Sequence, residues 1–171
     1  MKKTLLTLFI LTATAFSCFA QHIDSFGLAG EAGLPTGQAT SIYDYTIGFA
    51  VKLESPAKIK HLKFVASLGY TDYVLKSGLE KVIEADYLPM EVGAKYYVHS
   101  FYFEGNVGEE LDLNGSIPTQ RSGLVYLPTI GYTVQGLDFD EVDFGISYQG
   151  SFLSDGPLSR ISLSIVYRLN L

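Results

Sequence analysis

The ten residues DYTIGFAVKL, at positions 44–53, decide the fold. Apolar side chains alternate with small or polar ones along this stretch, and alternation with period two is typical of a β-strand with one apolar face. One face carries Tyr45, Ile47, Phe49, Val51 and Leu53. The other carries Asp44, Thr46, Gly48, Ala50 and Lys52. The stretch therefore predicts a strand, and the fold class depends on how often the pattern returns.

The same alternation returns along the rest of the chain. It is clear in residues 61–70, 88–99 and 161–171 and weaker in residues 25–34, 101–110, 123–134 and 138–149. Eight strands is an even number, and each has close to the roughly 9–11 residues that a tilted membrane-spanning strand needs. We therefore predict an all-β fold, a closed antiparallel up-and-down transmembrane β-barrel of eight strands.

The connections between these strands are expected to alternate in length. They are short near residues 55–58, 99–100 and 135–137, and longer and more polar at about 72–86, 111–122 and 150–159. Outer-membrane barrels have short periplasmic turns and longer outer loops. We expect both termini in the periplasm and any binding specificity in the long loops. Pro128 lies within a strand and removes a ladder donor, which predicts a bulge there.

The N-terminus has the features of a secretory signal. A basic start at Lys2 and Lys3 precedes an apolar run from Leu5 to Phe16 and a small residue at Ala20. We expect residues 1–20 to be a cleaved signal peptide and residues 21–171 to be one barrel domain. Cleavage would remove the single cysteine, and with it any disulfide or thiol chemistry. The formal charge of −6 argues against nucleic acid as a partner.

The second face of the strands favours a membrane barrel over a soluble one. That face is mostly Gly, Ala, Ser and Thr with isolated charges, whereas a soluble barrel would carry many Lys and Glu on the face that meets water. Charges inside a narrow barrel must pair. We therefore predict a polar network that closes the lumen, made of Glu31, Asp44, Lys52, Lys63, Glu91, Lys95, Glu104 and Arg168. The alternative is a soluble periplasmic or secreted barrel that binds an apolar ligand inside.

Aromatic residues on the apolar faces support the membrane interpretation. Several tyrosines stand near strand ends, where interfacial girdles form in membrane barrels. They are Tyr45, Tyr70, Tyr96, Tyr126, Tyr132, Tyr148 and Tyr167.

Three stretches resemble the small outer-membrane β-barrels of Gram-negative bacteria with OmpA-like or OmpX-like architecture. They are the glycine-rich GLAGEAGLP at 27–35, LPMEVGAKYY at 88–97 with the FYFEG that follows it, and the terminal YRLNL at 167–171. The last resembles the signal read by the barrel-assembly machinery, although Leu171 replaces the usual Phe. The resemblance implies location in the outer membrane among its lipids. It also implies insertion with the help of periplasmic chaperones and the assembly machinery.

No catalytic, cofactor or metal site is predicted. His61 and His99 are expected at the periplasmic rim, and no Ser–His–acid arrangement is evident around either of them. The acidic residues Asp138, Asp140, Glu141 and Asp143 lack the spacing of a calcium loop and are interpreted as a solvated turn. We expect a monomeric, non-enzymatic barrel with a structural, adhesive or interaction role. A lipid A-modifying outer-membrane enzyme is the remaining alternative.

Overall fold

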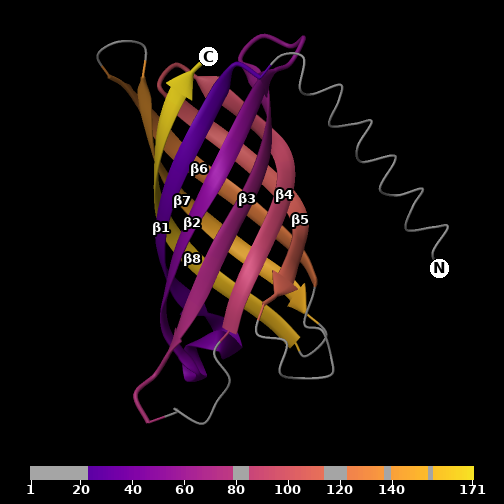
Figure 1. Ribbon diagram of the computed structural model, residues 1–171, viewed down its shortest axis with the longest axis vertical. Helices are drawn as coiled ribbons and strands as arrows, with labels where there is room; N and C mark the ends of the chain where they lie inside the picture. Colours follow the sequence, from indigo (N-terminus) through magenta and orange to yellow (C-terminus); the bar gives the residue numbers. More distant parts are fainter. Residues whose placement is uncertain (1–22, 79–84, 114–122, 137–139, 154–155) are drawn as a thin grey trace, which may run out of the picture.

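The computed structural model describes residues 23–78, 85–113, 123–136, 140–153 and 156–171. Eight strands and one short 3-10 helix follow one another: β1 (Ser25–Thr36), η2 (Gly37–Ser41), β2 (Tyr43–Pro56), β3 (Leu62–Leu75), β4 (Ala85–Val98), β5 (Phe101–Asp112), β6 (Gly123–Gln135), β7 (Glu141–Leu153) and β8 (Gly156–Asn170). Every strand pairs antiparallel with its chain neighbours, and the sheet closes into a barrel (Figure 1). The predicted fold class is confirmed. In the described part of the chain, no helix is long and apolar enough to cross a membrane.

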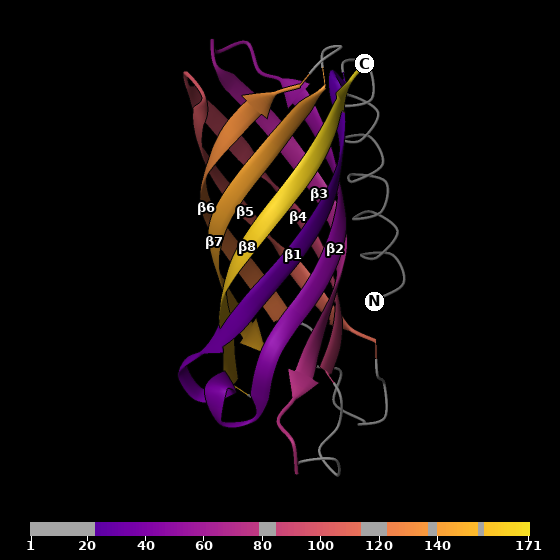
Figure 2. The same ribbon diagram turned by 90° about the vertical axis from the view of Figure 1, so that its left-hand side faces the viewer.

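The first and last strands close the ring. β1 and β8 pair in unbroken register from Ser25 opposite Asn170 to Thr36 opposite Ser159, and they lie side by side in Figure 2. Closure gives each strand two neighbours, so the sheet has no free edge whose backbone groups would need another partner.

The two ends of the barrel differ. β1 begins and β8 ends at one rim, which also carries the connections 57–61, 99–100 and 136–140 (upper end in Figure 1). We call this the terminal rim. The opposite, loop rim carries η2 and the connections 76–84, 113–122 and 154–155. His61 and His99 lie in terminal-rim turns with φ angles of 66° and 58°, a left-handed conformation that histidine adopts more readily than bulky residues do.

The prediction of a long connection at 150–159 is wrong. β7 continues to Leu153 and β8 starts at Gly156, so only residues 154–155 join them. Ser151 is buried inside the barrel and Phe152 is exposed outside, which continues the alternation of β7. The polar character of this stretch suggested a loop, but a polar side chain such as Ser151 also suits the interior of a narrow barrel.

The predicted bulge at Pro128 is also wrong. β6 keeps one register against β7 on both sides of this residue, but the pairing lapses between Tyr126 and Thr129. The pairing of Pro128 with Gly105 of β5 is kept. Pro89 behaves in the same way, because β3 and β4 lose their pairing only beside it. A strand with two neighbours tolerates a missing N–H on one side without a register shift.

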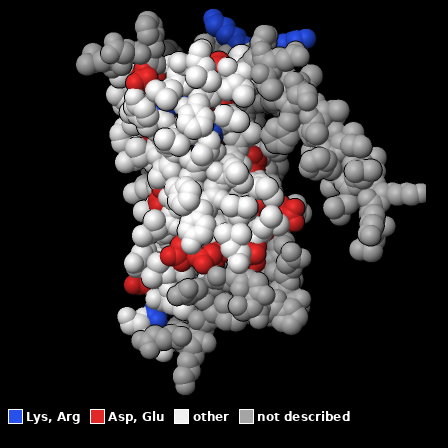
Figure 3. All heavy atoms as spheres, viewed as in Figure 1, with Lys and Arg blue, Asp and Glu red and all other residues white. Residues whose placement is uncertain are grey.

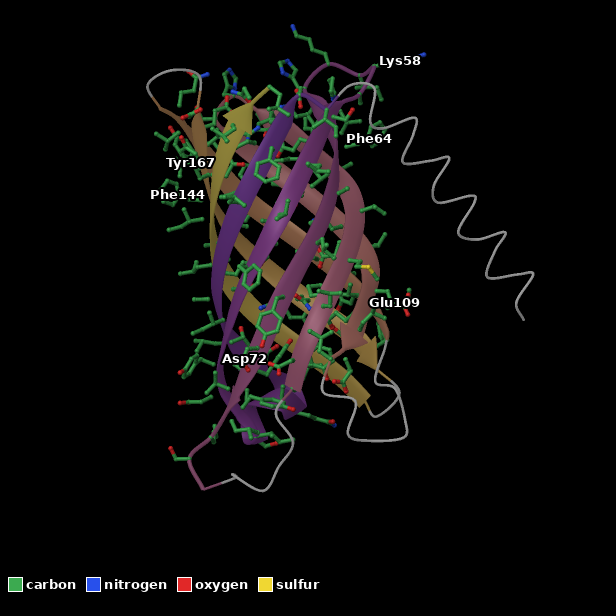
Figure 4. The ribbon with its side chains drawn as sticks, in the orientation of Figure 1. Lys58, Phe64, Asp72, Glu109, Phe144 and Tyr167 are labelled. Carbon is green, nitrogen blue, oxygen red and sulfur yellow. The ribbon has the colours of Figure 1, made fainter. Side chains whose placement is uncertain are left out.

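The two faces of the sheet have opposite character. Phe49 is 62% exposed and Leu163 is 63% exposed on the outer face, whereas the inner face buries charged and hydroxyl side chains. Figure 4 shows Phe144 and Tyr167 projecting outward from the wall. The outer surface in Figure 3 is largely uncharged, with acidic side chains gathered toward the loop rim. Six of the seven girdle tyrosines are exposed, and Tyr70 stacks on the outward-facing Phe49. Their place at a membrane interface stays a prediction.

Glycines on β6 and β7 make room for a tyrosine in the lumen. Tyr102 of β5 pairs with Gly131, which in turn pairs with Gly145. A methyl group at Gly131 would collide with the Tyr102 ring and stand 2.5 Å from the Phe144 carbonyl oxygen. The Tyr102 ring therefore lies across strands that present no side chain beneath it.

We predict that Gly131→Ala destabilises the barrel by about 1–3 kcal/mol, the usual range for overpacking. Gly105→Ala is the matched control, because a methyl group there meets nothing within 4 Å. Urea unfolding of both variants in detergent micelles measures the effect. Equal stability of the two variants would show that Tyr102 has room to move aside.

Candidate functional site

A closed ring of ion pairs crosses the lumen near the terminal rim. Lys95 Nζ lies 2.9 Å from Glu54 Oε1 and 2.5 Å from Asp143 Oδ2. Arg168 contacts the same two carboxylates, with Nη1 2.8 Å from Glu54 and Nη2 3.0 Å from Asp143. We call these four residues, Glu54, Lys95, Asp143 and Arg168, the ionic ring. Its members come from β2, β4, β7 and β8 and are at most 3% exposed, so the ring ties distant strands across the bore.

Further polar groups complete the bonding of the two carboxylates. Thr133 Oγ1 donates to Asp143 at 2.7 Å, and Ser25 Oγ donates to Glu54 at 3.3 Å. Lys63 Nζ lies 3.4 Å from Glu54 and 3.0 Å from Asp24 at the rim. Buried charges are stable only when paired and hydrogen-bonded, and both carboxylates meet this condition.

Two tyrosines line the ionic ring. Lys95 Nζ stands 4.2 Å from the centroid of the Tyr102 ring and 5.2 Å from that of Tyr97. The guanidinium carbon of Arg168 lies 5.6 Å from the Tyr97 centroid. These cation–π contacts are worth roughly 0.5–2 kcal/mol each. They fix the positions of the two cations more narrowly than ion pairs alone would.

A second ion pair spans the middle of the lumen. Lys52 Nζ of β2 lies 2.8 Å from Glu104 Oε1 of β5, and both side chains are nearly fully buried. Asn106 Nδ2 donates to the same carboxylate oxygen at 2.8 Å. Glu91 accepts a hydrogen bond of 3.1 Å from Ser67 Oγ.

A third group of polar residues forms a belt closer to the loop rim. Arg160 of β8 lies 3.1 Å from Glu31 of β1 and donates twice to Gln149 Oε1 of β7, at 3.0 and 2.7 Å. Gln149 and Ser151 both donate to the carboxylate of Glu110 on β5. The belt therefore links β1, β8, β7 and β5.

One small cavity lies between these groups. A cavity of about 20 Å³ is lined by Glu31, Phe49, Ala50, Lys52, Ser67, Gly69, Thr71, Pro89, Glu91, Leu127 and Arg160. A cavity needs roughly 10–15 Å³ to hold one water molecule. We call this space the chamber. It fits about one ordered water.

The structure brings seven of the eight predicted network residues into the lumen or to its rim, namely Glu31, Lys52, Lys63, Glu91, Lys95, Glu104 and Arg168. Asp44 is a correction, because it is exposed on the outside of the barrel. The β2–β3 register shifts between Tyr43 and Tyr45, so Asp44 is the extra residue of a bulge. Tyr43 faces inward in its place. That the network keeps the lumen closed in the membrane stays a prediction.

The sequence prediction missed several residues of the network. Glu54 and Arg160 lie one residue beyond the predicted strands 44–53 and 161–171, at positions of the inward face. Glu110, Asp143 and Gln149 lie at inward positions within the predicted strands 101–110 and 138–149. Asp143, interpreted as part of a solvated turn, is fully buried. Taking every polar residue on the inward faces of the predicted strands would have found Glu110, Asp143 and Gln149, and extending two strands by one residue would have found Glu54 and Arg160.

The lumen offers little to a metal ion. No group of three or more His, Cys, Asp and Glu side chains among the described residues is arranged to hold one. Asp138 lies outside the described residues. Lys52 contacts the carboxylate of Glu104, and Lys95 and Arg168 contact those of Glu54 and Asp143.

An apolar exterior around a filled polar lumen is the architecture of a small outer-membrane β-barrel. The crystal structure of Ail, the attachment invasion locus protein of Yersinia pestis, is similar, with a TM-score of 0.59 and 16% identity over 86% of this chain and 99% of Ail. The N-terminal β-barrel domain of Pseudomonas aeruginosa OprF matches with a TM-score of 0.54 and 8% identity, over 86% of this chain and 99% of that domain. The structure of the outer membrane protein AlkL matches with a TM-score of 0.51 and 13% identity, over 88% of this chain and 92% of AlkL. No protein-family model and no curated protein matches the sequence.

We predict that Lys95→Ala lowers the free energy of unfolding by about 3–5 kcal/mol, the usual cost of removing one partner from a buried ion pair. The loss follows because Glu54 and Asp143 would both lose their 2.5–2.9 Å cation contact. Lys58→Ala, at an exposed turn position, is the control and should change stability by no more than about 0.5 kcal/mol.

Urea unfolding in micelles at low and high salt measures both variants. The cost of Lys95→Ala should persist at high salt, because buried pairs are weakly screened. A cost no larger than that of Lys58→Ala would contradict a stabilising role for the ionic ring.

Proposed function

We propose that this chain is a non-enzymatic integral outer-membrane protein that acts through the surface of its loop rim. The observation that carries the proposal is the inversion of the barrel, with apolar residues outside and paired charges inside. Large apolar side chains such as Leu34, Phe152 and Leu163 are more than 60% exposed. Contiguous apolar surface on that scale is stable in lipid and prone to aggregation in water.

The inversion argues against a soluble barrel with an apolar ligand inside. Such a ligand needs a pocket of roughly 300–1,000 Å³ lined mainly by apolar groups. The chamber has about 20 Å³ and is lined in part by Glu31, Lys52, Glu91 and Arg160. Hydrocarbon has neither the room nor the chemistry to bind there.

The loop rim is the surface we assign to interaction with other molecules. Its two longest connections, 76–84 and 113–122, leave from β3–β4 and β5–β6, which are neighbouring hairpins. β7 and β8 are joined by only two residues, 154–155. The long segments are thus attached to one sector of the rim, and we propose that contact with a partner is made by that sector.

The composition of the loop-rim connections favours a partner that is not strongly charged. They carry three basic residues (Lys76, Lys81, Arg121) and three acidic ones (Glu80, Glu84, Asp155). The structure of Ail in complex with a heparin analogue describes an anionic ligand. These connections lack the excess of positive charge that attracts such polyanions. We therefore propose an adhesive or interaction role with an uncharged or weakly charged partner.

We predict that the expressed chain fractionates with the outer membrane of a Gram-negative host and shifts in gel mobility on boiling. An epitope tag inserted after Gly115, in the connection 113–122, should be accessible to antibody on intact cells. The same tag inserted after Lys58, in the connection 57–61, is the matched control and should be accessible only after permeabilisation.

Each result has a clear contrary. Recovery in the soluble fraction without a mobility shift would contradict the membrane proposal. The reversed pattern of tag accessibility would place the terminal rim outside the cell. That result would contradict the proposed role of the loop rim but not the membrane location.

The enzyme alternative is tested at the two histidines of the terminal rim. Known lipid-modifying barrels act at the outer leaflet, and we place this rim in the periplasm. We predict that the double variant His61→Asn, His99→Asn leaves lipid A unchanged by mass spectrometry. Asparagine is chosen because it tolerates the left-handed backbone at both positions. A changed lipid A profile, relative to cells expressing the parent chain, would support catalysis.

A further inference from the structure

We propose that the lumen is sealed twice, by two plugs of different chemistry that enclose the chamber and act independently. One plug is the ionic ring near the terminal rim. The other, the tyrosine plug, consists of Tyr43, Tyr73 and Tyr87 near the loop rim. The inference deepens the proposed function, because a barrel closed at both ends is not a passive pore. The inference rests on the proposed function in one respect only, namely the assignment of the loop rim to the outside of the cell.

The tyrosine plug is a packed aromatic cluster. The rings of Tyr43 and Tyr73 meet edge to face with centroids 5.3 Å apart, and those of Tyr73 and Tyr87 with centroids 5.7 Å apart. Tyr73 and Tyr87 are each 1% exposed. Ala39 of η2, Ala85 of β4 and Leu158 of β8 belong to the same buried cluster. The short helix therefore packs onto the plug from the loop side.

The tyrosine plug and the polar belt complete one cross-section of the barrel. The tyrosines come from β2, β3 and β4, and the belt residues Glu31, Glu110, Gln149 and Arg160 come from β1, β5, β7 and β8. Tyr73 lies near the end of β3 and Tyr87 near the start of β4, which both meet the loop rim. Aromatic rings thus fill the sector that the belt leaves open.

The two plugs are well separated. Tyr87 and Lys95 are on the same strand, eight positions apart, which corresponds to about 26 Å along an extended chain. The residues that line the chamber, among them Lys52, Ser67 and Glu91, lie between the tyrosine plug and the ionic ring along the barrel. No residue belongs to both plugs, so the loss of one leaves the contacts of the other unchanged.

The plugs exclude water by different means. Tyr73 makes no side-chain hydrogen bond to any described residue through its buried hydroxyl, so packing alone holds its ring. Apolar constrictions exclude ions because water does not wet them. The ionic ring instead fills the bore with charged groups held by their mutual contacts. Removing the aromatic side chain of one plug tyrosine should open the loop side of the lumen. Removing the side chain of Lys95 or Arg168 should open the terminal side.

The test places a thiol in the chamber. Ser67→Cys is introduced into the full chain together with Cys18→Ser, so that position 67 carries the only thiol. Labelling by a small, membrane-impermeant, cationic methanethiosulfonate is followed by mass spectrometry. Tyr87→Ala or Tyr73→Ala opens the tyrosine plug in one series, and Lys95→Ala or Arg168→Ala opens the ionic ring in the other. Two variants per plug allow for one that fails to fold, as judged by heat-dependent gel mobility.

In detergent, where both rims are accessible, we expect slow labelling in the Ser67→Cys background and labelling at least tenfold faster when either plug is opened. On intact cells of a host that lacks general porins, so that the reagent stays outside, we expect fast labelling only when the tyrosine plug is opened. Tyr126→Ala, an outward-facing tyrosine, and Lys58→Ala, an exposed lysine, are matched controls that should leave the slow rate unchanged.

Fast labelling without any plug variant would overturn the proposal, since the chamber would then be open. Unchanged labelling in detergent after either plug is opened would overturn it as well. Fast labelling on intact cells with only the ionic ring opened, and none with only the tyrosine plug opened, would reverse the orientation. That result would contradict the proposed function but support the double seal.

Discussion

The narrow bore of an eight-stranded barrel is the constraint on which the rest of the structure depends. Pairing of β1 with β8 closes the ring, and a ring of eight strands leaves an interior just wide enough for side chains. Each inward position must therefore be small, or must find a partner from a strand across the bore. Gly131 has no side chain at the point where the Tyr102 ring crosses it. Lys95 is long enough to contact both Glu54 and Asp143. Small residues leave room in the bore, and long charged residues fill it and pair across it.

Pairing across the bore also explains how a lumen with many charges is stable. An isolated ion pair gains little once desolvation is counted, but in the ionic ring each of four charges contacts two of opposite sign. The guanidinium of Arg168 also reaches Glu141 at 2.5 Å. Strands that are far apart in sequence are thus held together in the interior, in addition to the hydrogen bonds between neighbours. Glu54 and Arg168 are 114 residues apart.

The strands could be predicted from the sequence because alternation is local, whereas the partners inside the lumen could not. The faces of residues 44–53 and 88–99 follow from the chain itself, and seven of eight network residues were identified by face alone. Asp44 was misplaced because a bulge at the β2–β3 register turns it outward, and a bulge depends on the neighbouring strand. The local sequence assigns Asp143 to a solvated turn, because its contacts with Lys95 of β4 and Arg168 of β8 exist only once the barrel has closed. Pro128 needed no bulge, because only one of its two neighbours loses a bond.

A filled lumen also determines where this protein can recognise anything else. Side chains interlock across the bore, the chamber between them measures about 20 Å³, and a wall fixed by the β1–β8 closure cannot widen without breaking ladder hydrogen bonds. The face of the outer wall seen in Figure 3 carries few charged side chains away from the loop rim, so it offers lipid contact but few directional bonds. Only the connections vary in length and chemistry, and the two longest extend from β3–β6. On the proposed function, specific recognition falls to that sector, because binding residues are found more often on connections than on the wall of a rigid scaffold.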